Sequence, residues 1–335
     1  MIMAETGPGI LAQTDSLIMT NGESLSGEIK SLDRGVIIIE TDYSDSDFKL
    51  EWDKVASIRT ERKFLIINSS GDRYYGQLIS EAKDPSNVII DDVDIGRDTV
   101  NIADVIFFKE IDDTFWSRVD LLMSIGYTLA KANNSHQFSA NIKTGYTSSI
   151  FGADLYFKAF RSLQTTEDVT AKIKRTEGGL GFRYFVFKDW FGLVRSDLLQ
   201  SSELKLNIRA ITQGGIGYFP LKTNRMELGI AAGAAWNFED YDDLVTMDRN
   251  SAEAFFAVDY TIFNLGDLDL STRLLGYPSL TESKRFRSDL NFNVKYEFPL
   301  DFFIDFGFTL NYDNQPVEGA PSSDYVLQAT FGWEL

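Results

Sequence analysis

The chain has 335 residues, enough for one large domain or for a large and a small one. Its 50 acidic and 32 basic side chains leave a net charge of −18. It therefore lacks the basic surplus that phosphate neutralisation requires, and we exclude nucleic acid as a partner. The chain has no cysteine, which fits any compartment, and no apolar run of the roughly 20 residues that a membrane-spanning helix needs.

The first residues read "MIMAETGPGILAQTDSL". This stretch has no basic n-region and too short an apolar core for a complete signal peptide. Its "GILAQT" nevertheless resembles the tail of a signal peptide, with cleavage near Ala12 or Gln13. We therefore expect residues 1–14 to be a residual signal or a disordered N-terminus.

An internal repeat follows. The stretch "LIMTNGESLSGEI" at 17–29 matches "LIINSSGDRYYGQL" at 65–78, and each holds an alternating strand, a glycine turn and a second glycine. Asn21-Gly22 is a strong hairpin signal, because a type I′ turn needs positive φ at both central positions. With a period of about 48 residues, the pattern predicts two small SH3-like or Sm-like β-modules, residues 15–62 and 63–112.

From residue 116 onward the pattern changes to about twelve segments of strict alternation. The clearest is "FRSDLNFNVKYEF" at 286–298, in which apolar residues such as Phe292 share one face and charged residues such as Lys295 the other. Alternation by itself fits either a soluble sandwich, which buries the apolar face, or an outer-membrane barrel, which turns it to lipid.

The connections between these segments favour the barrel. Tight turns such as "FKDW" and "PLD" mostly alternate with longer polar connections such as "EDYDDLVTMDRNS" and "NQPVEGAPSS"; "QSS" is an exception. Short periplasmic turns alternating with longer extracellular loops are typical of outer-membrane barrels. The sequence therefore predicts an all-β protein: a transmembrane antiparallel up-and-down barrel of about twelve strands at 116–335. The two N-terminal modules would lie in the periplasm.

The polar face of the predicted strands carries charges of both signs. Those that we place on the lumen side are Arg183, Arg209, Glu227, Asp269, Arg273, Arg287, Asp289, Lys295, Glu297 and Asp305. Two interpretations stay open. The four arginines of this list, together with Arg285, could form a ladder that selects anions. Alternatively, they pair with Glu227, Asp269, Asp289 and Asp305 and partly occlude an interior that is narrower than that of a sixteen-stranded porin.

The chain ends on "DYVLQATFGWEL", one face of which is apolar to the last residue. An up-and-down barrel closes by pairing its last strand with its first, so such a strand can face lipid throughout. The ending resembles the C-terminal signal that the barrel assembly machinery reads in outer-membrane proteins. Tyr325, Phe331 and Trp333 match that signal, whereas Leu335 stands where Phe is commoner.

The whole chain also resembles the YdiY-like family of salt-induced outer-membrane proteins, which is defined as a domain of unknown function. The stretches that carry the resemblance are "DSLIMTNGESLSGEI", "IETDYSDSDFKLEWDKVASI", "FWSRVDLLMSIGYTLAKANNSHQF" and the closing "NYDNQP" and "SSDY". The resemblance implies the fold and the location better than it implies an activity.

Candidate catalytic chemistry is sparse. His136 is the only histidine. A Ser–His mechanism of the outer-membrane phospholipase kind needs a serine within hydrogen-bond reach, which adjacent Ser135 does not provide on a strand. Acidic clusters at 42–47, 91–98 and 239–243 lack the constrained loop of a calcium site. We expect no catalytic residue, no metal and no cofactor.

These features predict a non-enzymatic outer-membrane protein, either a narrow pore for ions or small polar solutes or a structural envelope component. The alternative is an accessory subunit whose N-terminal modules dock an envelope protein complex. Tyr74 and Tyr75 are then either exposed contacts or side chains that pack between the two modules. A barrel-embedded hydrolase is a third hypothesis. The expected partners are outer-membrane lipid and lipopolysaccharide, the barrel assembly machinery during insertion, and an envelope protein.

Overall fold

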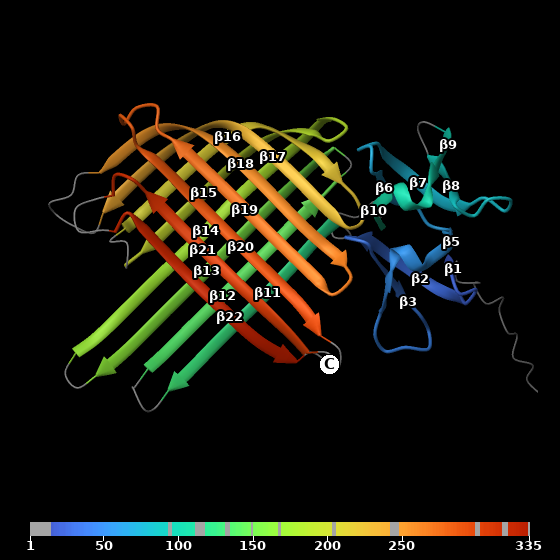
Figure 1. Cartoon of the computed structure of the whole chain (residues 1–335), viewed down its shortest axis with the longest axis horizontal. Helices are drawn as coiled ribbons and strands as arrows, with labels where there is room; N and C mark the ends of the chain where they lie inside the picture. The colour runs from blue at the N-terminus through green and yellow to red at the C-terminus, as the bar shows by residue number, and fades with distance from the viewer. Residues whose placement is uncertain are drawn as a thin grey trace, which may run out of the picture. The chain divides into compact units, whose positions relative to one another are not determined.

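The computed structural model describes residues 15–92, 96–110, 118–130, 135–148, 150–166, 169–202, 206–241, 248–298, 302–316 and 321–333. The chain divides into two compact units (Figure 1), one reaching to Ser117 and the other beginning at Arg118. We call them the front unit and the barrel unit, and we describe each by itself. Within the described residues, no helix is both long and apolar enough to cross a membrane.

The front unit contains the same succession of elements twice. The first copy comprises β1 (Asp15–Met19), β2 (Ser24–Asp33), β3 (Val36–Glu40), β4 (Phe48–Glu51), the 3₁₀ turn η1 (Trp52–Lys54) and β5 (Val55–Arg59). The second comprises β6 (Phe64–Asn68), β7 (Arg73–Ser80), β8 (Asn87–Asp92), β9 (Gly96–Asn101), η2 (Ile102–Asp104) and β10 (Val105–Glu110). The internal repeat read from the sequence is therefore a structural repeat.

Glycines at matching positions shape both copies. Gly22 and Gly71 adopt φ of 87° and 79°, the left-handed region that a residue with a Cβ rarely enters. At Gly27 an added Cβ would lie 2.2 Å from the carbonyl oxygen of Glu40, and at Gly76 it would lie 2.2 Å from that of Asp91. The second glycine of each repeat is thus required because the neighbouring strand of the ladder approaches too closely for a Cβ.

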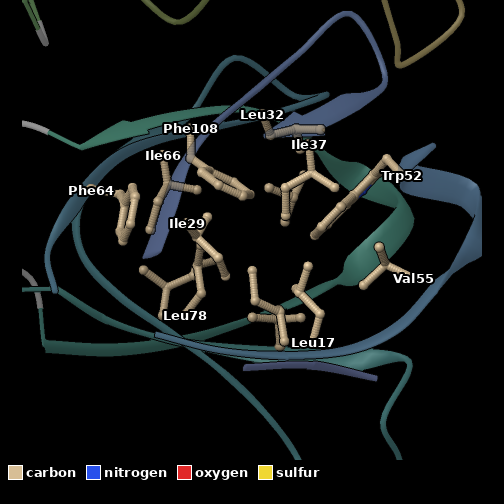
Figure 2. Close-up of a cluster of buried hydrophobic side chains, with 14 of the residues drawn as sticks. Leu17, Ile29, Leu32, Ile37, Trp52, Val55, Phe64, Ile66, Leu78 and Phe108 are labelled. Atoms are coloured by element: carbon tan, nitrogen blue, oxygen red, sulfur yellow. The ribbon is translucent and has the colours of Figure 1, made fainter. Parts of the chain in front are cut away.

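The two copies share one sheet and one core, so the modules expected at 15–62 and 63–112 form a single unit. β5 of the first copy pairs with β7, and β10 of the second pairs with β2. Figure 2 shows the common core, in which Trp52 of the first copy meets Phe108 of the second with ring centroids 5.8 Å apart. The fraction of surface that a chain buries on folding rises with its size, so a shared core stabilises the two copies more than two separate cores of about 50 residues would.

The barrel unit is one sheet of twelve antiparallel strands in chain order, as the sequence predicts. The strands are β11 (Val119–Ala130), β12 (Ser135–Thr147), β13 (Phe151–Thr166), β14 (Val169–Phe187), β15 (Trp190–Ser201), β16 (Leu206–Lys222), β17 (Met226–Tyr241), β18 (Arg249–Leu265), β19 (Leu268–Pro278), β20 (Phe286–Phe298), β21 (Phe302–Asp313) and β22 (Ser323–Trp333). Figure 1 shows this sheet curving round on itself.

Alternation along these strands separates two faces. One face, which we call outward, exposes large apolar side chains such as Ile125 (77% exposed), Val186 (71%) and Phe331 (69%). The other, inward face holds the buried side chains of the unit, among them Phe255, Tyr277 and Glu253. The unit therefore covers its polar face and leaves its apolar face open, the reverse of a soluble sandwich.

The edges of the twelve-stranded sheet differ from the expectation. Backbone ladders join every consecutive pair from β11 to β22, but among the described residues no ladder joins β22 to β11. Leu121 and Leu122, on opposite faces of β11, are both largely exposed, as befits an edge strand. The predicted pairing of the last strand with the first is thus absent here, and we call the gap between β11 and β22 the seam.

Candidate functional site

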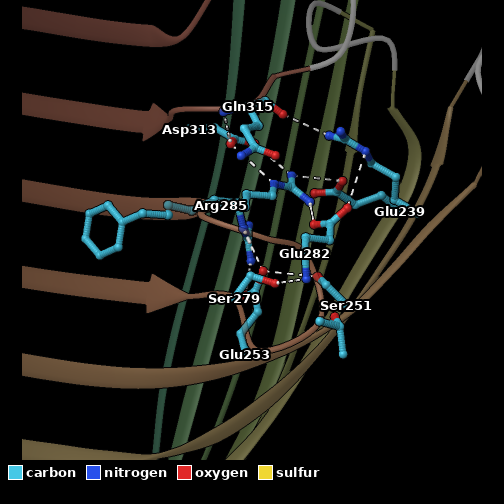
Figure 3. Close-up of polar contacts among 12 residues, drawn as sticks. Glu239, Ser251, Glu253, Ser279, Glu282, Arg285, Asp313 and Gln315 are labelled. Carbon is cyan, nitrogen blue, oxygen red and sulfur yellow. Dashed lines mark hydrogen bonds and ion pairs between the residues drawn. The ribbon is translucent and has the colours of Figure 1, made fainter.

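The inward face of β16–β21 holds a cluster of buried charges, the main candidate site of the protein (Figure 3). β16, β17, β18, β20 and β21 contribute through their inward parity, and the segment between β19 and β20 adds two more side chains. We call the group the interior ion-pair cluster. Its members are Arg209, Glu239, Tyr241, Ser251, Glu253, Glu282, Arg285, Arg287 and Asp313.

Glu239 on β17 lies at the centre of the cluster and is fully buried. Its carboxylate contacts Arg209 Nη2 at 2.7 Å and Arg285 Nη2 at 3.4 Å. The hydroxyl of Tyr241, two residues along on the same face, donates to Glu239 Oε2 at 2.6 Å. A buried carboxylate is tolerated only when such partners replace its lost hydration.

Arg285 joins three segments of the chain. Its guanidinium contacts Glu282 at 2.6 Å and Asp313 at 2.7 Å in addition to Glu239, and its side chain is only 1% exposed. The five N–H donors of arginine in a fixed planar fork suit this bridging of several carboxylates. Arg285 therefore ties β17 and β21 to the connection between β19 and β20.

Arg287 forms the second pair of the cluster. It reaches Glu253 on β18 at 2.6 Å, and Ser251 donates a further hydrogen bond to the same carboxylate at 3.1 Å. The guanidinium also lies over the ring of Tyr277, 5.1 Å from its centroid. This arrangement gives Arg287 both a carboxylate and an aromatic face, which compensates for its burial.

Apolar side chains fill the interior next to the cluster. Phe255, Tyr277 and Ala235 pack together on the inward face, and Leu193 and Ile211 pack against them. Asn237 is fully buried beside this group, and neither polar atom of its side chain has a hydrogen-bond partner in the described structure. Side chains therefore pack against one another in this part of the interior, along β15–β19.

The predicted lumen-facing residues all lie on the inward parity. Their partners, however, differ from those expected: Arg209, Arg285 and Arg287 pair with Glu239, Glu253, Glu282 and Asp313, and Arg273 pairs with Asp259. Because carboxylates surround the buried guanidinium groups, this structure favours occlusion of the lumen over a ladder of unpaired arginines.

The remaining predicted lumen residues are not members of the cluster. Lys295 pairs with Glu297 at 2.8 Å, and its neighbours in register are Asp269 and Asp305. Arg183 is exposed, Asp289 is half-buried, and Glu227 is a register neighbour of Lys222.

A second inward pair escaped the sequence reasoning. Arg195 on β15 contacts Asp154 and Asp197, both at 2.9 Å, and lies 5.4 Å from the ring centroid of Tyr156. The inward face of β15 also carries the apolar residues Phe191 and Leu193, so the sequence of this strand does not show a clearly charged face. The spacing of Arg195 and Asp197 by two residues, which places both on one face, was the available signal.

His136 lies on the outward face, not among the inward charges. Its Nδ1 is hydrogen-bonded to the hydroxyl of Tyr127 at 2.8 Å, on the neighbouring strand. The side chain of Ser135 lies outside the described residues. In the part of the chain that the structure describes, no three His, Cys, Asp or Glu side chains are placed to hold a metal ion.

Tyr74 is buried in the core of the front unit, where its hydroxyl donates to Asp98 at 2.8 Å. Of the two alternatives, exposure is wrong for Tyr74 and packing is right, because its position on β7 points toward the core that the two copies share. Tyr75 is half-buried. In the C-terminal signal, Tyr325 and Phe331 are exposed on the outward face. The side chain of Trp333, the whole of Leu335 and residues 1–14 lie outside the described residues.

Fold and site together define an all-β protein in which a twelve-stranded up-and-down β-barrel carries buried ion pairs inside and apolar side chains outside. The chain belongs to the family described as "Protein of unknown function, DUF481", which matches residues 123–334. This match confirms the resemblance to YdiY-like proteins seen in the sequence. No curated protein matches the chain.

Proposed function

We propose that the protein is an outer-membrane β-barrel whose interior forms a narrow pathway for ions or small polar solutes, restricted by the interior ion-pair cluster. The observation that carries the proposal is the reversed distribution of side chains, with exposed apolar groups outside and buried ion pairs inside. A bilayer covers an outward apolar surface of this kind, which water would not. The alternation of tight and longer connections supports the same location.

The cluster would lie at the extracellular end of the barrel. Glu239 and Tyr241 close β17, Ser251 and Glu253 open β18, and Arg285 precedes β20, so all are near the longer connections. In outer-membrane barrels the longer connections are extracellular and the short turns face the periplasm. The cluster would then narrow the outer mouth of the barrel.

Planar-bilayer recording of the purified protein tests this function. We expect small conductance steps from the wild type, because ion pairs and aromatic side chains fill much of the lumen. Arg287→Ala with Glu253→Ala removes both members of one pair, leaves no unpaired charge, and should raise the conductance several-fold. The matched control, Arg273→Ala with Asp259→Ala, removes a half-exposed pair outside the cluster and should change conductance little.

The absence of conductance steps from all three proteins would reject the pore and leave a structural envelope role.

We propose further that the function is non-enzymatic. The pairing of His136 with Tyr127 on the outward face supports this, since it directs the single histidine away from the inward charges. Any lipid hydrolysis measured in the wild-type preparation should therefore be background and should be unchanged in His136→Ala. Loss of hydrolysis in His136→Ala would contradict the proposal.

A second candidate function is the docking of an envelope protein through the front unit. Tyr43 and Phe48, around the β3–β4 connection, expose aromatic surface with ring centroids 6.2 Å apart. Exposed paired aromatics are typical of protein contacts. A photocrosslinker at Tyr43 in the full chain should give one discrete adduct in cells, and a crosslinker at Lys83 on the same unit should give none. Equal labelling from both positions would contradict docking.

A further inference from the structure

Three basic side chains interrupt the apolar outward face of the barrel. Arg161 on β13 lies in register with Phe138 on β12 and with Lys174 on β14, and Lys172 lies in register with Leu163. Their parity is that of Leu155 and Phe157, which are exposed on the outward face. We call Arg161, Lys172 and Lys174 the outward basic patch.

The patch has no counterpart elsewhere on this face. At the other outward positions of the twelve strands, as far as the structure describes them, no Lys or Arg occurs. Within the described residues, the ion pairs of β13–β15 include Arg175 with Glu177 and Arg195 with both Asp154 and Asp197, all on the inward face. None of them includes a patch residue. Among the residues that the structure describes, the patch therefore concentrates positive charge on one sector of the barrel.

A groove adjoins the patch. Tyr127, His136, Phe138, Arg161 and Leu163 line it, and its volume is about 360 Å³. Its walls are mostly aromatic or aliphatic, and its polar groups are the guanidinium of Arg161 and the hydrogen-bonded pair of Tyr127 and His136. A ligand that suits both parts has an anionic head and an apolar body.

The height of the patch matches a lipid headgroup. About ten residues separate Phe151, at the short-turn end of β13, from Arg161; at 3.3 Å per residue and a tilt near 45° they span roughly 23 Å. The apolar band of an outer-membrane barrel is about 25 Å tall. On the proposed orientation, Arg161 and its neighbours therefore lie where the outer leaflet presents its headgroups.

We propose that the outward basic patch binds the phosphates of an anionic lipid of the outer leaflet, with the acyl chains against the apolar surface of β12–β14. Arginine and lysine are the side chains that neutralise phosphate, arginine as a bidentate fork and lysine as a point charge. The inference rests on the proposed membrane location and adds to it a lipid class and a binding sector.

Native mass spectrometry of the full-length protein in detergent tests the site, with bis-phosphorylated lipid A as the probe. The triple variant Arg161→Gln, Lys172→Gln, Lys174→Gln should bind the lipid about 100-fold more weakly, because each cation near a membrane surface contributes roughly fivefold. Lys172→Gln with Lys174→Gln should lose roughly 20-fold and guards against misfolding of the triple variant. The control Lys49→Gln, Lys63→Gln, Lys83→Gln makes the same charge change on exposed residues of the front unit and should bind as the wild type does.

Two further arms identify the source of the phosphate. Lipid A stripped of its phosphates should bind the wild type as weakly as intact lipid binds the triple variant. Inorganic phosphate should not displace the bound lipid. If inorganic phosphate at the same concentration as lipid A did displace it, the patch would be a site for free phosphate and not for a lipid. Equal affinity of wild type and both patch variants would overturn the proposal.

The membrane location is measured separately, by flotation of the same preparations with phosphatidylcholine vesicles. Wild type that floats, together with patch variants of unchanged lipid affinity, would refute the lipid site alone. Wild type that fails to float would refute the outer-membrane function and the lipid site with it.

Discussion

The front unit and the barrel unit are built from the same alternating pattern and use it in opposite ways. In the front unit the apolar parity is covered, so that Phe64, Ile66 and Phe108 are inaccessible to solvent. In the barrel unit the apolar parity is exposed, and the buried positions include the charged side chains Glu239, Glu253 and Arg285. The comparison teaches that period-two alternation defines two faces of a sheet but not which face is covered.

The largest effect expected from this comparison is in the front core. Phe108→Ala should lower the free energy of unfolding of the front unit by about 3–5 kcal/mol, because it empties the site where Trp52 and Phe64 pack on one ring. The measurement is urea-induced unfolding of the full chain followed by tryptophan fluorescence. The matched control is Phe48→Ala at an exposed position, which should cost less than about 1 kcal/mol. Equal losses would contradict a shared core.

In the barrel unit the sensitive positions should be charged. Arg285→Met leaves Glu239, Glu282 and Asp313 without their common partner and should cost about 3–5 kcal/mol, as expected for a broken buried ion pair. The change should appear as a lower temperature at which the folded band disappears on SDS gels. Arg273→Met, in a half-exposed pair, should cost less than about 1 kcal/mol. A larger loss of stability from Arg273→Met than from Arg285→Met would contradict the view that the buried ion pairs are the sensitive positions.

The front unit has its own charged group, and this one should respond to pH. Hydrogen bonding to Lys30, with further help from the charge of Arg62, lowers the pKa of Glu28 below its ordinary value of 4.5. The contribution of Glu28 to stability is therefore present above pH 4.5 and is lost as the pH falls through the lowered pKa. Burial instead raises the pKa of Glu110, although it also contacts Arg62, so its contribution is present below pH 4.5 and is lost as pH rises.

Denaturant midpoints measured from about pH 6 to pH 3 test these signs. Wild-type stability should fall over the acid end of this range, and Glu28→Gln should fall less steeply there. Glu110→Gln should leave the acid fall in place and flatten the profile above pH 4.5. Identical slopes in all three proteins would show that Glu28 and Glu110, the two carboxylates beside Arg62, do not shape the dependence of stability on pH.

The smallest change in stability, but a distinct structural one, is expected at the seam. An unpaired strand edge in lipid leaves backbone N–H and C=O groups without partners, so β11 and β22 should pair once the protein is in a bilayer. Leu121→Cys should then form a disulfide with Ala329→Cys or Phe331→Cys, which share its outward parity. Leu122→Cys, on the opposite face, should form none with either. Disulfides from both Leu121→Cys and Leu122→Cys, or from neither, would contradict the pairing of β11 with β22.

Much of the fold was readable because side-chain parity is local. The segment 286–298, chosen from its alternation, coincides with β20, and the charges expected on the lumen side lie on the inward face. The repeat in the front unit was readable for the same reason, since Gly22 and Gly71 mark equivalent turns. The ion-pair partners were not readable. Glu239 is paired with Arg285 across the curved sheet, and separation along the chain gives no measure of that distance.

The sequence by itself determined the strand type, the repeat, the change of pattern near residue 116 and the two faces of every strand, because each depends on residues a few positions apart. Only the tertiary structure decided that the two front copies share one core, that Tyr74 is buried, and that Phe255 and Tyr277 pack inside the barrel beside buried ion pairs. These features arise from contacts between strands distant in the chain. Their register and curvature follow from how all the strands pack together.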